Sequence, residues 1–144
     1  CRTNFNMPRR TSAGTDYNRV NLLMPVIEKR IGLHLGDCDA YINVAGGMRI
    51  NEPALDMGIV LAVLSSYKNI AIDSKTICFG EVGLVGEVRA VNQAEQRVIE
   101  AAKLGFDRCI MPKVNCDSLN IDREQLKGMK LVGVKSIYEL LEVI

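Results

Sequence analysis

Residue types that commonly carry out acyl-transfer chemistry are sparse in this sequence. His34 is its only histidine and lies between a predicted helix and the next predicted strand. A Ser-His-Asp or Cys-His mechanism would depend on that side chain alone, and we interpret His34 as a surface loop residue. A serine beside a desolvated lysine remains as a possible nucleophile, because that pair attacks an amide without histidine. The candidates for such a pair are Ser65 or Ser66 with Lys68 or Lys113.

The sequence indicates neither a metal centre nor a phosphate-binding loop. Its cysteines are odd in number, widely spread and without a Cys-x-x-Cys pair: Cys1, Cys38, Cys78, Cys109 and Cys116. We interpret them as reduced thiols of a cytosolic protein. The glycine patterns that cradle phosphates in nucleotide-binding proteins do not occur, and Gly80, Gly83 and Gly86 alternate with residues that suit strands and a turn. We therefore expect no cofactor in this domain.

Length and composition predict one folded domain over residues 1–144. Apolar residues make up 48% of the chain and charged residues 24%, which excludes a disordered chain. The 18 basic and 17 acidic residues leave a net charge of +1, so any contact with nucleic acid must come from local clusters. The longest apolar run, from Met57 to Leu64, is far shorter than the about 20 residues of a membrane span. We expect a cytoplasmic protein without membrane contact.

Alternating helix and strand patterns predict the α/β (α+β) class. Apolar residues at three- and four-residue spacing predict a first helix from Asp16 to Arg30, which contains Pro25. The remaining segments are predicted from their composition and their flanking turn residues. The predicted strands are 40–45, 48–50, 76–79, 108–111 and 131–134, with a hairpin over 80–91, and the predicted helices are 53–67, 95–104 and 136–142. We expect one mixed sheet with flanking helices and a protruding β-hairpin.

The predicted helix that begins at Pro53 is apolar on nearly every side, so we expect it to be central and covered. Asp56 is its one polar residue in the first turn. A carboxylate in such surroundings needs a partner, and we expect Asp56 to brace a neighbouring loop or to contact a second subunit.

Four blocks, in order along the chain, carry a resemblance to a known family. They are 8–11 with 16–19, the segment 43–50, the hairpin 80–91, and the run 101–106 that continues to 110–113. The chain is similar to the proteolytic domain of the Lon family, and it more closely resembles the Lon-like C-terminal domain of the bacterial DNA repair proteins called RadA or Sms. The resemblance covers nearly the whole chain and implies a Lon-type fold.

The resemblance also implies that the protease dyad is lost. The Lon nucleophile follows a Gly-Pro pair at the start of the central helix, and Ala54 stands at the matching position of Glu52-Pro53-Ala54. The Lon lysine ends a Gly-Gly-Leu-Lys run after the hairpin, and Glu95 stands at the matching position of Asn92-Gln93-Ala94-Glu95. A methyl group cannot attack a carbonyl, and a carboxylate has the wrong charge to replace the lysine. We expect a pseudo-protease without a catalytic residue.

In RadA-type proteins, this domain follows a zinc finger and a RecA-like ATPase domain. The resemblance therefore implies an excised C-terminal domain of a hexameric, DNA-dependent ATPase for DNA repair and recombination, with ATP, magnesium and zinc bound elsewhere in the parent protein. It implies DNA binding and ring assembly for this domain. The rival interpretations are an active Ser-Lys peptidase of Lon type and a peptide-binding regulatory module.

Lysine and arginine side chains supply most of the affinity for DNA phosphates. Arg49 and Arg89 flank the vacated catalytic position in the resemblance and are the first candidates for DNA contact. Arg9, Arg10 and Arg19 form a second candidate cluster near the first helix. No aromatic platform accompanies these arginines, so we expect backbone contact with single-stranded or branched DNA, without sequence preference.

Overall fold

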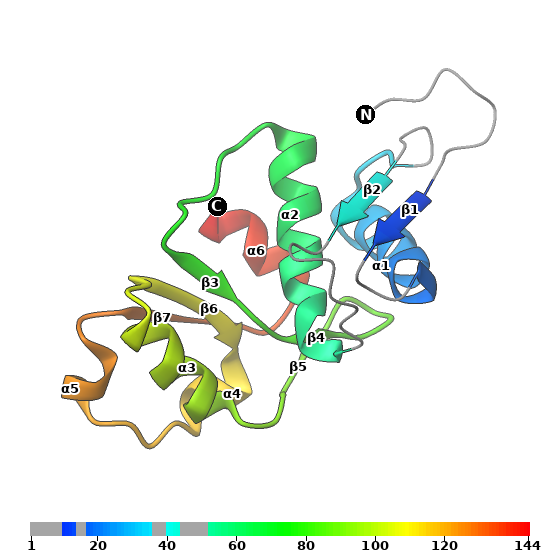
Figure 1. The fold of residues 1–144 in the computed structure, drawn as a ribbon. Coiled ribbons are helices and arrows are strands. Elements are labelled where there is room, and N and C mark those ends of the chain that lie inside the picture. Colours follow the sequence, from blue (N-terminus) through cyan, green and yellow to red (C-terminus); the bar gives the residue numbers. More distant parts are fainter. Residues whose placement is uncertain (1–9, 14–16, 36–39, 44–51) are drawn as a thin grey trace. The chain divides into compact units, whose positions relative to one another are not determined.

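The computed structural model describes residues 10–13, 17–35, 40–43 and 52–144 (Figure 1). The chain divides into two units, which we describe separately. The first unit comprises Cys1–Glu52 with Leu84–Gly86, and the second comprises Pro53–Gly83 with Glu87–Ile144. The assignment of residues 1–144 to one domain stays a prediction.

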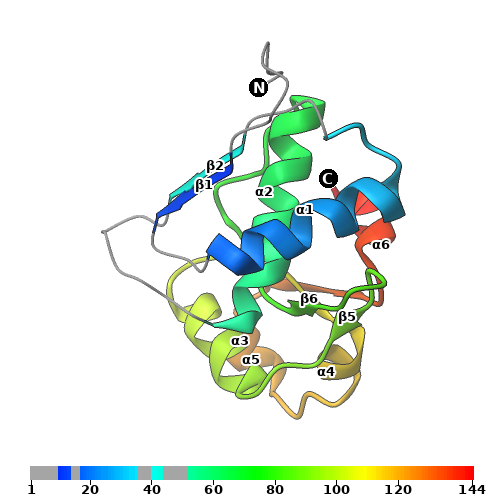
Figure 2. The ribbon, with the colours of Figure 1, turned by 90° about the vertical axis from the view of Figure 1, so that its right-hand side faces the viewer.

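The first unit contains a strand, a helix and a second strand. Strand β1 (Arg10–Ala13) runs parallel to β2 (Ala40–Asn43) and is joined to it through helix α1 (Tyr17–Ile31) (Figure 2). Pro25 lies inside α1 and does not end it, whereas Gly32, with a φ of +76°, follows its last residue. Glycine reaches this left-handed conformation without the steric penalty of a side chain, which suits a helix end.

The second unit contains the remaining elements. Its helices are the 3-10 turn η2 (Pro53–Leu55), α2 (Asp56–Lys68), α3 (Ala94–Lys103), α4 (Lys113–Asp117), α5 (Arg123–Leu126) and α6 (Ile137–Val143). Its strands are β3 (Thr76–Cys78), β4 (Glu81–Val82), β5 (Val88–Arg89), β6 (Arg108–Pro112) and β7 (Lys130–Val134). The described helices and strands confirm the mixed α/β class.

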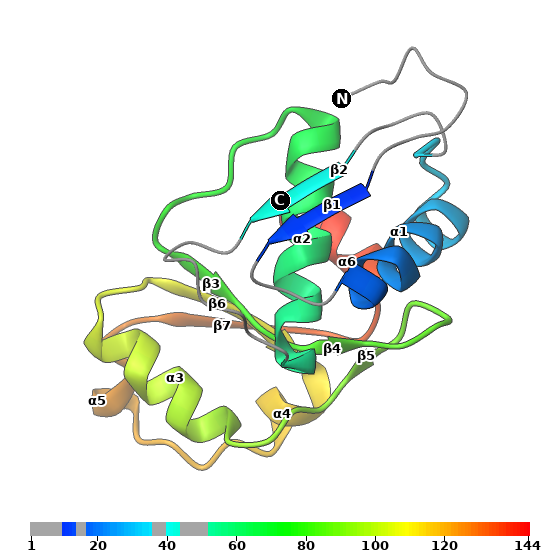
Figure 3. The same cartoon turned by 45° about the vertical axis from the view of Figure 1, so that its right-hand side comes forward.

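A three-stranded parallel sheet in the order β3-β6-β7 forms the centre of the second unit. Helices α2 and α6 lie on one side of this sheet, and α3, α4 and α5 lie on the other (Figure 3). Strands β4 and β5 pair separately as an antiparallel hairpin. The described strands therefore form three sheets, with β1-β2 as the third, where the sequence predicted one mixed sheet. Alternation of helices and strands in a sequence does not reveal which strands pair.

Side chains from both sides of this sheet are buried, as the apolar strand residues require. Cys109 and Met111 of β6 belong to a cluster with Val98 and Ala101 of α3, whereas Ile110, between them in the sequence, is fully buried outside that cluster. On α2, the residues Met57, Val60 and Leu64 have no exposed surface. The prediction of a covered central helix is confirmed for this face only, because Ile59 and Val63 are half-buried and Ala62 is exposed.

Most predicted elements occur within one or two residues of their expected bounds. The sequence did not predict β1, nor the short helices α4 and α5. The predicted strand 48–50 lies outside the described residues.

Candidate functional site

Ala54, at the position of the Lon nucleophile, is buried, and its backbone forms a hydrogen bond with the segment after β3. It lies in η2 and is only 4% exposed. Its carbonyl accepts the Gly80 N–H at 2.8 Å, and the Gly80 carbonyl accepts the Met57 N–H at 3.0 Å. A Cβ on Gly80 would overlap Met57 Sδ, so glycine permits this approach between the start of the central helix and the segment after β3.

Asp56 ties the same helix to the hairpin. Its side chain is 1% exposed, and Oδ2 accepts the Val82 N–H of β4 at 3.0 Å. A carboxylate that accepts a backbone N–H satisfies a donor that would otherwise be buried without a partner. The contact confirms that Asp56 braces a neighbouring segment.

Glu95, at the position of the Lon lysine, is an exposed residue of the first turn of α3. Its Oε1 accepts the Asn120 N–H at 2.9 Å and so holds the loop before α5. A carboxylate in the first turn also interacts favourably with the helix dipole. The contacts of Glu95 are those of a structural residue.

Polar side chains fix the loop that leads into α3. The buried Asn115 accepts the Val91 N–H at 2.8 Å and donates to the Val91 carbonyl at 3.0 Å. Arg97 donates from Nε to the Asn92 carbonyl at 3.1 Å, and its guanidinium lies 5.9 Å from the ring centroid of Phe79. Gln93 has a φ of +56°, a left-handed conformation that glycine adopts more readily. The resemblance places Gln93 opposite the second glycine of the Lon run.

The candidate residues for a Ser-Lys pair either bond to other groups or are exposed to solvent. The Ser65 hydroxyl donates to the Ile70 carbonyl at the end of α2, and Ser66 and Lys68 are exposed. Lys113 lies 2.8 Å from Asp117, whose hydrogen bond and negative charge raise the pKa of the lysine. A raised pKa keeps Lys113 protonated, the opposite of what a general base requires. His34 is exposed, which confirms its interpretation as a surface residue.

Two cysteines of the sheet are poor nucleophiles. Burial, followed by the neighbouring Cys109, raises the pKa of the Cys78 thiol to about 12, whereas the nearby Arg108 acts to lower this pKa. Burial and the neighbouring Cys116 raise the pKa of Cys109 to about 12. Because the thiolate is the reactive form, both side chains are inert near neutral pH. The described residues hold no cluster of three or more His, Cys, Asp or Glu side chains that could bind a metal ion.

The structure describes the predicted DNA-contacting arginines only in part. Arg89, on β5, donates from Nε and Nη2 to Glu87 Oε1 at 3.1 and 2.8 Å, and its side chain is 58% exposed. Arg19 is half-buried in the first turn of α1, and Arg10 lies in β1. Arg9 and Arg49 lie outside the described residues. The grouping of these arginines into DNA-binding clusters stays a prediction.

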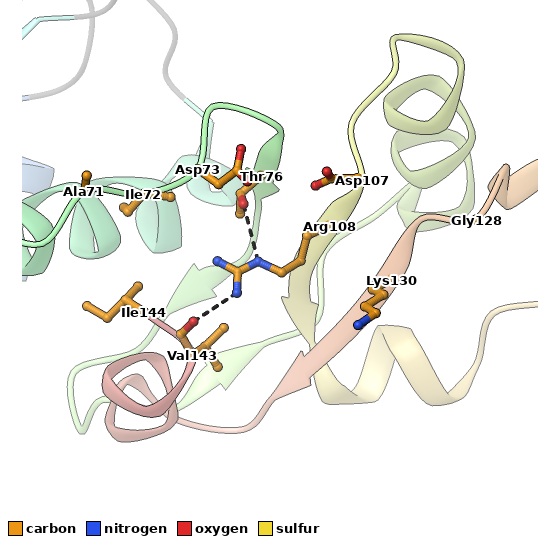
Figure 4. Close-up of a pocket in the computed structure, with 10 residues that line it drawn as sticks. All are labelled: Ala71, Ile72, Asp73, Thr76, Asp107, Arg108, Gly128, Lys130, Val143 and Ile144. Atoms are coloured by element: carbon orange, nitrogen blue, oxygen red, sulfur yellow. Dashed lines mark hydrogen bonds between the residues drawn. The ribbon is translucent and has the colours of Figure 1, made fainter.

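The sequence did not predict a pocket at the end of the sheet where β3, β6 and β7 begin (Figure 4). Ala54 and Gly80 lie at the other end, where β3 finishes. Its volume is about 530 Å³, and Arg108 extends across it. Thr76, Arg108 and Lys130 are the first residues of the three strands and lie in register. The sequence signal was a basic residue at the start of two strands, but without the strand pairing nothing placed them together.

The second unit is thus a three-layer α/β domain that carries a hairpin, with Ala54 and Glu95 at the positions that the resemblance assigns to the Lon dyad. The chain belongs to the family described as subunit ChlI of Mg-chelatase, which matches residues 21–115. Among the described residues, no helix has the length and apolar character needed to cross a membrane.

The chain is homologous to bacterial RadA proteins, as the motifs indicated. It is 46% identical to the DNA repair protein RadA of Halalkalibacterium halodurans, over 98% of this chain and 30% of the relative. It is 48% identical to RadA of Bacillus subtilis, over 96% of this chain and 30% of the relative. It is 42% identical to RadA of Streptococcus pneumoniae, over 97% of this chain and 32% of the relative. The chain therefore spans about a third of the length of these relatives.

Proposed function

We propose that this chain is a non-proteolytic, Lon-like domain of a RadA-type DNA repair and recombination ATPase, and that it serves DNA binding and ring assembly. The observation that carries the proposal is the similarity to DNA repair proteins named RadA over 96% or more of the chain. The proposal places ATP, magnesium and zinc in parts of the parent protein outside this chain.

Loss of peptidase activity is supported by the environment of the dyad positions. Ala54 offers only a methyl group in a closely packed backbone turn, and Glu95 is bound to a loop N–H. Lys113 is held protonated by Asp117. We expect no cleavage of casein and no labelling by a fluorophosphonate probe. Covalent labelling of any serine, located by mass spectrometry, would support an active Lon-type peptidase instead.

Contact with DNA through Arg89 is compatible with its ion pair. An exposed ion pair contributes only about 0 to 1 kcal/mol, so a DNA phosphate can replace Glu87 as the partner of the guanidinium. Phosphate binding also releases counterions from the DNA, which favours the exchange at low salt. Arg89 therefore remains the described residue with the strongest case for DNA contact.

The test is fluorescence anisotropy of the chain with labelled single-stranded and branched DNA across a salt series. Arg89→Ala should weaken binding several-fold for every sequence and lower the salt slope by about one. Glu87→Gln should strengthen binding, because it removes the competing carboxylate. Lys103→Ala is the matched control: Lys103 is exposed on α3 and only 3.9 Å from Glu100, a comparable surface ion pair. Equal losses in Arg89→Ala and Lys103→Ala would argue against a specific phosphate contact.

Ring assembly is tested separately by sedimentation velocity with and without single-stranded DNA. We expect a DNA-dependent species of hexamer mass. A monomer under all conditions would remove the assembly role from this chain while leaving the DNA-binding role to the anisotropy experiment.

A further inference from the structure

The pocket at the beginning of β3, β6 and β7 has the size of a small-molecule site. Its volume of about 530 Å³ falls within the range of about 300 to 1,000 Å³ typical of ligand pockets. Its lining combines polar and charged residues with apolar ones: Ala71, Ile72, Asp73, Thr76, Asp107, Arg108, Gly128, Lys130, Val143 and Ile144. All of these residues belong to the second unit.

Arg108 is held in place before any ligand arrives. Its Nε donates to Thr76 Oγ1 at 3.3 Å, and its Nη1 donates to the Val143 carbonyl at 3.0 Å (Figure 4). A guanidinium has five N–H groups, so these two bonds leave further donors on Nη1 and Nη2. Ordering the long side chain in advance reduces the entropy lost on binding.

The surroundings of the guanidinium favour an anion that carries an apolar group. Figure 4 shows the guanidinium between Thr76 and the last residues of the chain, with Val143, Ile144 and Ile72 near its outer end. Apolar neighbours lower the local dielectric constant and strengthen a charge-assisted hydrogen bond. They also offer apolar surface for the body of a ligand.

The acidic residues of the pocket limit the charge of that anion. Asp73 and Asp107 lie on the Thr76 side of the guanidinium, where Asp73 Oδ1 also accepts the Lys75 N–H at 2.9 Å. Lys130 supplies a second positive charge, so the side chains of the four charged residues sum to zero, and the terminal carboxylate of Ile144 adds one negative charge at the pocket. The negative groups repel a dianion such as a phosphate monoester more strongly than a single carboxylate, and taking the dianion out of water also costs more.

We propose that this pocket binds a small monocarboxylate with an apolar body, whose carboxylate is received by the Nη1 and Nη2 groups of Arg108. The proposal goes beyond the proposed function and does not depend on it. The pocket lies where the strands begin, whereas Ala54 contacts Gly80 beyond the end of β3. Ligand binding here and DNA binding at Arg89 can therefore fail separately.

Three probes with six carbon atoms each test the proposal by two-dimensional NMR of the ¹⁵N-labelled chain. Hexanoate should shift the signals of the pocket residues, and the Arg108 Nε–Hε signal, with a saturable Kd on the order of 1 mM. Hexyl phosphate should bind at least about threefold more weakly, and hexylamine should give no saturable shift. Absence of a saturable shift with hexanoate, or equal binding of hexylamine, would overturn the proposal. Tighter binding of hexyl phosphate would overturn the assignment to monocarboxylates.

Variants link the binding to Arg108. Arg108→Lys keeps the positive charge but loses the paired N–H donors of the guanidinium, and should weaken hexanoate binding at least about tenfold. Arg97→Lys is the matched control, because Arg97 also donates to a backbone carbonyl and a side-chain oxygen, yet does not line the pocket. Ile72→Asp leaves both bonds of Arg108 intact and should abolish binding, so it tests the proposal even if Arg108→Lys does not fold. Unchanged affinity in Arg108→Lys or Ile72→Asp would contradict the proposal.

Discussion

The two ends of the β3-β6-β7 sheet differ in what occupies them. Where the strands end, backbone groups bond to one another, as between Ala54 and Gly80, and the acidic side chain of Asp56 is buried. Where they begin, charged side chains such as Arg108 and Lys130 border an open pocket. The end that holds the dyad positions of the Lon resemblance is thus tightly packed, and the charged, open site lies at the other end.

Glycines at the packed end show how its geometry is kept. Gly80 lies against Met57, and an added Cβ on Gly83 would overlap the Glu87 carboxylate. Gly80 requires a residue without a side chain, because the buried Met57 fills the space and the φ of +155° disfavours other residues, whereas at Gly83 the flexible Glu87 side chain could move aside. Packing between side chains and glycine backbone therefore holds the positions that the Lon resemblance assigns to the dyad.

The largest difference between the two ends should appear when an aspartate is removed from each. Asp56→Ala leaves the buried Val82 N–H without its acceptor, which should lower the free energy of unfolding by about 2 to 3 kcal/mol. Asp73 also accepts a backbone N–H, from Lys75 at 2.9 Å, but it is exposed. Asp73→Ala should therefore cost less than about 1 kcal/mol, because water replaces the acceptor. Urea denaturation of both variants makes the comparison, and equal losses would contradict it.

Between the two ends of the sheet, the buried thiol of Cys109 should make the free energy of unfolding fall as the pH rises into the alkaline range. Cys109 has no exposed surface, and its pKa is raised from 9.0 to about 12. The folded state holds this proton more tightly, so the contribution is fully present below pH 9 and is lost as the pH rises toward 12. The slope attributable to this thiol is at most about 1.4 kcal/mol per pH unit.

Urea denaturation from pH 8 to pH 11 measures this slope. Cys109→Ala should show a shallower decline of the unfolding free energy with pH than the unsubstituted chain. Met111→Leu changes another buried residue of β6 without removing a titratable group, and it should keep the original slope. An identical slope in Cys109→Ala would show that this thiol does not titrate differently on folding.

The sequence predicted those features that depend on local patterns. The apolar pattern after Pro53 predicted the central helix, although only one of its faces is buried, and the isolated carboxylate of Asp56 predicted a bracing contact. It did not predict the grouping of strands into three sheets, because pairing is decided by contacts between distant segments. For the same reason it missed the pocket: Thr76, Arg108 and Lys130 become neighbours only through the register of the sheet. The homology to RadA was predictable because its motifs extend along most of the chain.

The smallest expected effect tests whether the loop into α3 keeps a backbone shaped for glycine. Gln93 adopts a φ of +56°, which costs a residue with a side chain about 1 to 2 kcal/mol, whereas glycine loses more entropy on folding. Because the relief of the strained backbone exceeds the extra entropy that glycine loses, Gln93→Gly should raise the free energy of unfolding by about 0.5 to 1 kcal/mol. Gln96→Gly, at an exposed position inside the same helix, should lower it by a similar amount, since glycine there only weakens the helix. Opposite signs for the two glutamines, measured by thermal denaturation, would support a retained Lon-type loop in which only the side chains have changed. A loss of stability in both variants would show that the left-handed turn at Gln93 is not strained, and would remove this link between the loop and the family's glycine run.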